Sequence, residues 1–128
     1  MNRVVHFEMP ADDADRVTRF YSDVFGWQMQ QMGPEFGDYI VATTTESDEA
    51  GPRNPGAING GFFPKSSGQP PIPSVVIEVD DITAHMNKVR DAGGQIVGEP
   101  QEIPGIGQFV VFVDTEGNRV SMIQPPPR

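Results

Sequence analysis

An internal repeat is the feature that most constrains this chain. The segments VVHFEMPADDADRVTRFYSDVFGW (residues 4–27) and SVVIEVDDITAHMNKVRDAGGQI (residues 74–96) follow the same pattern of side chains. An offset of 68 residues aligns four pairs: His6 with Ser74, Asp13 with Asp81, Asp23 with Asp91 and Gly26 with Gly94. A repeat of this length indicates that the chain contains two copies of one supersecondary unit.

Each copy opens with a strand. Around the start of the chain Val5, Phe7 and Met9 alternate with His6 and Glu8, so these two sets point to opposite faces. In the second copy the alternation separates two further sets: Val75, Ile77 and Val79 on one face, with Ser74, Val76 and Glu78 on the other.

A helix follows each strand. Asp12 or Asp13 supplies the first N-cap, and Asp80 or Asp81 supplies the second. Glycine ends each helix, at Gly26 in the first copy and at Gly93 and Gly94 in the second. Apolar spacing predicts a buried set of side chains: Phe20, Tyr21, Val24, Phe25, Val75, Ile77, Met86 and Val89.

The remainder of each copy predicts three more strands. GDYIVA (37–42) matches GQFVVF (107–112), and INGGFFP (58–64) matches RVSMIQP (119–125). We therefore predict a single α+β domain over residues 1–128, made of two βαβββ units. Unit one covers residues 1–63, a Pro-rich linker covers 64–73 and unit two covers 74–128. A longer loop, residues 46–57, occurs only in unit one.

Composition excludes several classes of function. The 18 acidic and 9 basic side chains give a net charge of -9, which disfavours nucleic acid and anionic membranes and would suit a cationic ligand. No cysteine is present, so only His and carboxylates could hold a metal. The chain has no apolar run of membrane-spanning length and no signal-peptide pattern, so a soluble, cytoplasmic protein is expected.

The chain resembles the vicinal oxygen chelate superfamily, which holds glyoxalase I, extradiol dioxygenases and bleomycin resistance proteins. The resemblance rests on the paired units, on FYSDVFGW (20–27) following His6, and on DTEGNRVSMIQP (114–125). It implies curled sheets around a shared cleft, with the helices packed outside. It also implies a homodimer, although pairing of the units within one chain or across a dimer stays open.

In metal-dependent members of that superfamily, each unit contributes one ligand from its first strand and one from its last. The corresponding positions here are His6, Ser74, Gly60 (or Asn59 after a one-residue slip) and Ser121. One imidazole among glycine, amide and hydroxyl groups does not provide the three ligands that a divalent transition ion needs. We therefore expect no metal and no cofactor. The remaining histidine, His85, is expected to be a solvated side chain on its helix.

The cleft-facing positions instead predict a partly polar pocket for a small molecule. Its candidate ligand-binding residues are His6, Glu8, Ser74, Glu78, Arg119 and Ser121. Three roles are open for His6: a hydrogen-bonded structural residue, a ligand contact, and a general acid or base. Trp27 and Tyr39 could stack on a ligand or serve in packing.

These observations favour a metal-independent small-molecule binding protein of the glyoxalase/bleomycin resistance type, and the acidic charge favours a role in sequestering a cationic ligand. The alternative is a glyoxalase- or dioxygenase-like metalloenzyme acting on a small molecule, with bound Ni, Zn, Fe or Mn. Whether the chain is an enzyme stays open at this point, and the ligand cannot be identified from the sequence.

Overall fold

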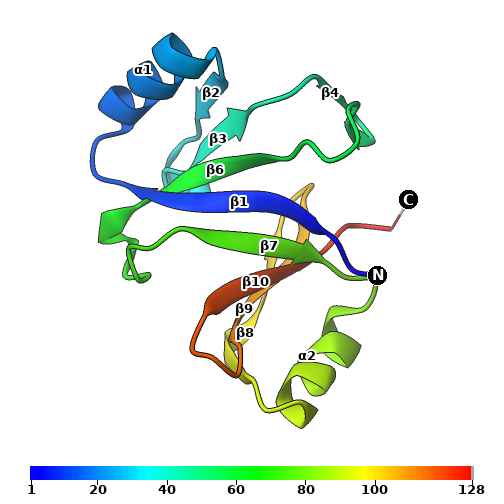
Figure 1. Cartoon of the computed structure of the whole chain (residues 1–128). Coiled ribbons are helices and arrows are strands. Elements are labelled where there is room, and N and C mark those ends of the chain that lie inside the picture. The colour runs from blue at the N-terminus through cyan, green and yellow to red at the C-terminus, as the bar shows by residue number, and fades with distance from the viewer. Residues whose placement is uncertain (128) are drawn as a thin grey trace. The chain divides into compact units, whose positions relative to one another are not determined.

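The computed structural model describes residues 1–127, and Figure 1 shows their helices and strands. The elements in chain order are β1 (Val4–Ala11), α1 (Ala14–Phe25), β2 (Gln28–Gln31), a 3-10 turn (Pro34–Phe36), β3 (Ile40–Thr43), β4 (Ser47–Asp48), β5 (Gly51–Pro52), β6 (Asn59–Pro64), a 3-10 turn (Lys65–Ser67), β7 (Ser74–Glu78), α2 (Ile82–Asp91), β8 (Gln95–Ile103), β9 (Gly107–Val113) and β10 (Arg119–Gln124). The predicted α+β class and the repeated strand, helix, three-strand order are confirmed. The hairpin of β4 and β5 is an addition to the first repeat.

Two compact units divide the described residues. The first unit is His6–Pro73, and the second unit is Ser74 onward together with Met1–Val5. Polar contacts tie the first residues of the chain to the second unit: the Asn2 side chain donates to the Glu78 carbonyl, and the Glu78 N–H donates to the Arg3 carbonyl. The segment 64–73 begins with the last residue of β6 and continues into the second 3-10 turn, where Lys65 pairs with Asp12 at 3.1 Å.

The first unit contains four strands in the order β2-β3-β6-β1, in which β1 and β6 are parallel. Register pairs Phe7 with Gly60 and Met9 with Phe62, so these residues share one face. Helix α1 packs on that face. The cluster there consists of Ile40, Ala42 and Phe62, with Phe7, Met9, Ala11, Ala14, Val17, Tyr21, Trp27 and Met29 packed around it.

The second unit repeats this plan with the order β7-β10-β9-β8. Strands β7 and β10 are parallel, and Met122 pairs with Ile77. Helix α2 packs on the face that carries Met122. The cluster there consists of Val79, Ile82, Met86, Val110 and Met122, with Val89, Ile96 and Phe112 packed around it.

The predicted N-caps resolve to Asp13 and Asp81, whose side chains accept from the N–H groups of Arg16 and Ala84. Helix α1 ends at Gly26 in the left-handed conformation, as predicted. Helix α2 ends differently, because Ala92 at its C-cap has a negative φ and the first glycine follows one residue later.

Part of the predicted core was wrong. Phe20, Val24 and Phe25 are 54%, 56% and 60% exposed, because Val17 and Tyr21 form the side of α1 that meets the sheet. Val75 is 38% exposed, because it lies at the start of β7, outside the cluster that α2 covers. Met86 is buried as predicted, whereas Tyr21, Ile77 and Val89 are half-buried.

Neither helix within residues 1–127 has the length and apolar character needed to cross a membrane.

Candidate functional site

The first unit places two predicted site residues on the sheet face opposite α1. His6 and Glu8 alternate with Phe7 along β1, so they point away from the helix. Their register partners on β6 are Asn59 and Gly61. The structure therefore brings together His6, Glu8 and the polar start of β6 on one surface.

Glu8 carries the strongest chemical signal on this surface. The half-buried carboxyl accepts a hydrogen bond from the Tyr39 hydroxyl, just before β3. Burial raises the pKa of Glu8 above its ordinary value of 4.5, and the hydrogen bond from Tyr39 only partly opposes that rise. The charged form of Glu8 is therefore less stable here than it would be in water.

The Tyr39 hydroxyl responds to the same surroundings. Burial, and then the charge and hydrogen bonding of Glu8, raise the pKa of Tyr39 far above its ordinary value of 10.0. Tyr39 therefore stays protonated at any working pH and remains a hydrogen-bond donor.

A glycine makes room for this pair. The nearest atoms to a Cβ added at Gly61 would be the Tyr39 ring and hydroxyl, in a clash that no normal packing allows. Gly61 is also the register partner of Glu8. The tyrosine ring thus lies over Gly61, the one of the two glycines on β6 that faces away from α1.

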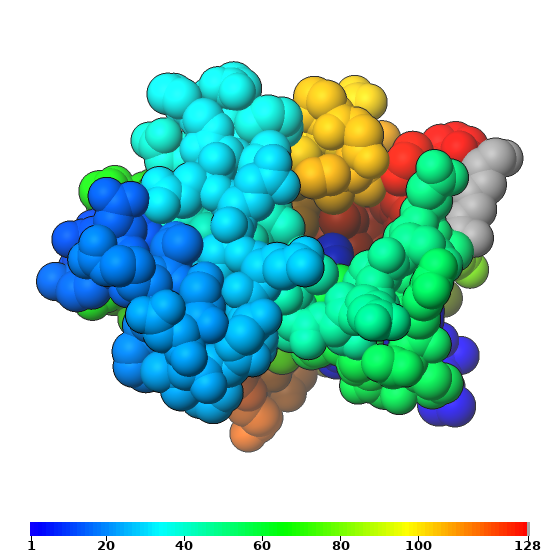
Figure 2. Space-filling view, turned by 90° about the horizontal axis from the view of Figure 1, so that it is seen from above, coloured from blue at the N-terminus to red at the C-terminus, as the bar shows by residue number. Residues whose placement is uncertain are grey.

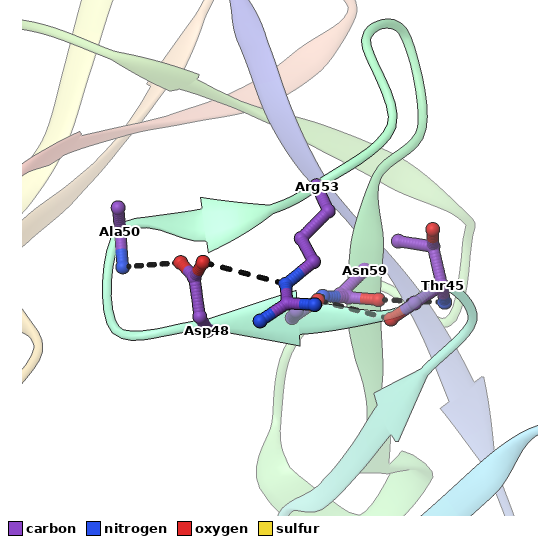
Figure 3. Close-up of polar contacts among 6 residues, drawn as sticks. Thr45, Asp48, Ala50, Arg53 and Asn59 are labelled. Atoms are coloured by element: carbon purple, nitrogen blue, oxygen red, sulfur yellow. Dashed lines mark hydrogen bonds and ion pairs between the residues drawn. The ribbon is translucent and has the colours of Figure 1, made fainter.

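Asn59 has a structural task at the start of β6 (Figure 3). Its Oδ1 accepts from the N–H groups of Thr44 at 2.8 Å and Thr45 at 3.3 Å, and its Nδ2 donates to the Ser47 hydroxyl at 2.8 Å. The amide therefore fixes the chain where it leaves β3 for the β4–β5 hairpin.

The hairpin itself extends away from α1 as an arm, visible in Figures 1 and 2. Asp48 accepts from the Ala50 N–H at 2.9 Å and pairs with Arg53 at 3.5 Å, as Figure 3 shows. An open depression of about 760 Å³ lies at its base, lined by Gly26, Gln28, Thr43, Thr44, Thr45, Glu46, Ser47 and Arg53. Its lining is mostly polar, and several of its groups are engaged in holding the hairpin.

The other predicted site residues belong to the second unit. Ser121 pairs with Val76 and Ile123 with Glu78, so the face that carries Ser74 and Glu78 also carries Arg119 and Ser121. Ser121 is 4% exposed. The Glu78 carboxylate pairs with Arg3 at 3.5 Å, which gives it a partner within its own unit.

His85 is half-buried, which corrects its expected role as a solvated side chain. Its Nδ1 lies 3.2 Å from the Asp81 carbonyl and its Nε2 lies 3.3 Å from the Asn2 side-chain oxygen. Trp27 stacks on Tyr21, with ring centroids 4.7 Å apart, in the cluster beneath α1. His85 therefore makes polar contacts within the second unit, whereas Trp27 packs within the first.

The donor groups do not fit a divalent metal. Gly60 lies on the helix-facing side, where an added Cβ would meet Phe7, so this candidate ligand position was wrong. Asn59 does share the face of His6, but its amide is committed to the loop. Among residues 1–127, no three His or carboxylate side chains gather in a group that could hold a metal ion.

Sequence reasoning did not find the contact between Glu8 and Tyr39, or the role of Gly61. For Tyr39 the sequence predicts only stacking on a ligand or packing. The long loop between β3 and β6 conceals the register that sets Val41 opposite Gly61 and brings Tyr39 near it. The available signal was the glycine pair in NGG, because a glycine within a strand often marks close approach by another group.

Sequence comparison identifies relatives over nearly the whole chain. The profile of the Glyoxalase/Bleomycin resistance protein/Dioxygenase superfamily matches residues 3–122. A glyoxylase-like domain-containing protein of Didymella fabae is 31% identical over 123 residues, which cover 93% of this chain and 91% of that protein. The lactoylglutathione lyase of Haemophilus influenzae is 26% identical, with 95% and 92% covered.

The putative glyoxylase CFP32 of Mycobacterium tuberculosis is 30% identical over 122 residues, or 94% of this chain. This chain spans only 43% of that protein.

Solved structures share the fold. The methylmalonyl-CoA epimerase of Streptomyces coelicolor has a TM-score of 0.72 with 99% of both chains covered, at 14% identity. With this likeness of fold and the profile match over residues 3–122, the chain belongs to the Glyoxalase/Bleomycin resistance protein/Dioxygenase superfamily, the vicinal oxygen chelate proteins.

Proposed function

We propose that this chain is a metal-independent small-molecule binding protein, and that a cationic group of its ligand binds at Glu8. The observation that carries the proposal is the half-buried Glu8 carboxyl on the sheet face opposite α1, where the Tyr39 hydroxyl donates to it and burial raises its pKa. A ligand cation beside this carboxylate would compensate for the solvation that burial removes.

The remainder of the chain favours the same ligand charge. A net charge of -9 produces a negative potential that attracts cations and repels anions. His6 lies on the same face of β1 as Glu8, two residues earlier, and is the second proposed ligand contact.

Ligand charge is tested by a thermal-shift panel of cationic compounds, including cationic antibiotics, beside neutral and anionic compounds of similar size. A cation at 100 times its dissociation constant should add about 2.7 kcal/mol of stability. Binding of anions in preference to cations would contradict the proposal.

The role of Glu8 is tested by Glu8→Gln, which keeps the size of the side chain and removes its charge. Its control is Glu99→Gln on β8, which makes the same change of net charge at an exposed position. We expect the thermal shift to survive in Glu99→Gln and to be lost in Glu8→Gln. Equal shifts in the two variants would show that the cation binds elsewhere.

Metal independence is tested by elemental analysis after purification without chelator. We expect less than about one Ni, Zn, Fe or Mn per ten chains, because the donor set described above cannot supply three ligands. Near-stoichiometric metal, lost together with ligand binding on chelation, would overturn this part of the proposal.

An enzyme acting on a small molecule is the second candidate, because relatives that match nearly their whole length include a lactoylglutathione lyase. Turnover of lactoylglutathione would be assayed with and without added Ni, Zn, Fe or Mn, and after chelation. Metal-dependent turnover would favour the enzyme over the binding protein.

We also propose a homodimer as the functional form. The apolar patch of Phe20, Val24 and Phe25 on α1 supports it, because large apolar groups gathered on a surface favour association. Sedimentation at tens of micromolar as a species of 14.0 kDa would show a monomer instead.

A further inference from the structure

We propose that Tyr39 is a positioning residue for the Glu8 carboxyl, and that Gly61 leaves the space in which the tyrosine ring lies. We call this position on β6 the seat. The inference rests on the proposed function, in which Glu8 binds the ligand. It assigns separate tasks to the three residues: Glu8 meets the ligand, Tyr39 orients Glu8, and Gly61 leaves space for Tyr39.

The seat follows from the positions of the three residues in the sheet. Glu8 and Gly61 are register partners on the parallel strands β1 and β6. Val41, the register partner of Gly61 on β3, is two residues after Tyr39. The pairing of β3 with β6 thus brings the Tyr39 ring, just before β3, over Gly61 and its hydroxyl to Glu8.

The hydrogen bond has a fixed direction whenever Glu8 is ionised. A carboxylate only accepts, and the Tyr39 hydroxyl has one proton to donate. That single bond restrains the carboxyl group while leaving further acceptor capacity on its two oxygens. Tyr39 can therefore hold Glu8 in place without blocking a ligand that donates N–H groups.

The second unit shows that the fold does not require this arrangement. The repeat places Val76 at the position of Glu8 and Phe109 at the position of Tyr39. Strand register sets Ser121 opposite Val76, as it sets Gly61 opposite Glu8, so Ser121 takes the place of Gly61. This corrects the alignment of INGGFFP with RVSMIQP by one residue, since that alignment set Ser121 at Gly60. A copy without the carboxyl, without the hydroxyl and with a side chain at the seat still forms the same order of strands, so the sheet itself does not require the three residues.

The first test measures Glu8 directly and uses no ligand. The Glu8 carboxyl carbon is titrated by ¹³C NMR in the whole chain, and its signal is assigned by its loss in Glu8→Gln. Tyr39→Phe keeps the ring and removes the donor. We expect it to raise the proton affinity of Glu8 by at least about tenfold, because the hydrogen bond favours the charged form of the carboxyl and a tenfold change corresponds to about 1.4 kcal/mol. An unchanged titration would overturn the positioning role.

The second test examines the seat. Gly61→Ala should displace the ring and raise the proton affinity of Glu8 in the same direction as Tyr39→Phe. In the Tyr39→Phe background, Gly61→Ala should no longer alter the Glu8 titration, because the hydrogen bond is already absent. An equal effect of Gly61→Ala in both backgrounds would show that the glycine acts on Glu8 by another route.

Gly60→Ala is the matched control for the seat. Its added methyl group would meet the Phe7 main chain on the helix-facing side, so it should lower the melting temperature whether or not Tyr39 is present. In a Tyr39→Ala background, by contrast, Gly61→Ala should lose its thermal cost. A persistent cost would overturn the seat.

These experiments separate the two proposals. If no cation in the thermal-shift panel binds the chain, the proposed function is refuted, but the titration results for Glu8 still stand. An unchanged Glu8 titration in Tyr39→Phe would refute the positioning role, whatever the panel shows.

Discussion

The two units share one order of elements but carry different chemistry on the sheet face opposite their helices. The first unit presents His6 and Glu8 there, with Tyr39 held against Glu8. The second unit buries Val76, Ser121 and Ile123 on the corresponding face. The repeat thus preserves the scaffold, while the two copies differ where a ligand could bind.

The helix-facing sides show what both copies must keep. Each unit packs an apolar strand face against its helix, and each helix begins with an Asp whose side chain caps it. This combination of apolar burial and capping is sufficient to define a strand and a helix in either copy. The opposite face has no such requirement in common.

The two helices differ in how firmly they are buried. Helix α2 places Ile82 and Met86 in the core of its unit, whereas no residue of α1 is fully buried. The alignment of the copies sets Val24 of α1 at the place of Ala92, just past the end of α2. The second helix should therefore be the more sensitive to truncation.

The largest expected effect is the loss of stability in Ile82→Ala. Ile82 is 1% exposed, so removing its side chain leaves a cavity and should lower the free energy of unfolding by about 3–4 kcal/mol. Arg19→Ala, at an exposed position of α1 outside the apolar patch, is the control and should change it by less than about 0.5 kcal/mol. Urea denaturation measures both variants, and similar losses would contradict the difference between the helices.

Glycines at matching places in the repeat should differ next. Gly107 has a φ of +131°, and an added Cβ would meet the Gln124 carbonyl, so Gly107→Ala should cost about 3 kcal/mol. Gly37, which the GDYIVA and GQFVVF segments align with Gly107, has a φ of +65° and nothing within 4 Å of an added Cβ. Gly37→Ala should therefore cost only about 1 kcal/mol. Equal costs in urea denaturation would mean that the contact with Gln124 contributes nothing.

The sequence alone predicts the two units, their helix N-caps and the two faces of β1 and β7, because these features depend on local periodicity. It also held an unused signal about α1. The repeat aligns Phe20 with Lys88, an exposed residue of α2, which indicates that Phe20 lies on the outer side of its helix. The prediction that Phe20 is buried rested on its apolar side chain alone and was wrong.

The site was harder to predict because it depends on register across a long loop. A slip of one residue exchanges Asn59, Gly60 and Gly61 between the two faces of β6, and local periodicity cannot choose between those registers. The contact of Tyr39 with Glu8 joins residues on separate strands. It becomes visible only when the β3–β6 and β1–β6 pairings are both known.

A smaller effect is expected at Asn59, which holds the hairpin found only in the first unit. Asn59→Ala removes three hydrogen bonds and should lower stability by about 1–2 kcal/mol, with faster hydrogen exchange at the N–H groups of Thr44 and Thr45. Asn54→Ala, which removes one bond to the Thr45 hydroxyl, is the control on the same loop. If the two variants exchange alike, Asn59 is not the anchor.

The smallest effects should appear in the pH dependence of stability. Asp114 in the second unit and Glu8 in the first should change the stability in opposite directions as the pH rises. Asp114 in the second unit accepts from the Asn118 side chain, from the Asn118 N–H and from the Glu116 N–H, and these bonds lower its pKa below 3.8. Its contribution is present above that value and is lost as the pH falls through the folded pKa.

Glu8 behaves in the opposite way because burial raises its pKa in the folded chain. The folded state binds the proton more tightly than the unfolded state, so the contribution of Glu8 is complete below pH 4.5 and is lost as the pH rises through the folded pKa. Urea denaturation between about pH 2.5 and 8 would compare the stability of Glu8→Gln with that of Asp114→Asn. Glu8→Gln should remove a loss of stability on the alkaline side of 4.5, and Asp114→Asn should remove one on the acid side of 3.8. If Glu8→Gln leaves the alkaline side unchanged, the carboxyl is as well solvated as one in water, and the first unit loses the property that distinguishes its face from that of the second.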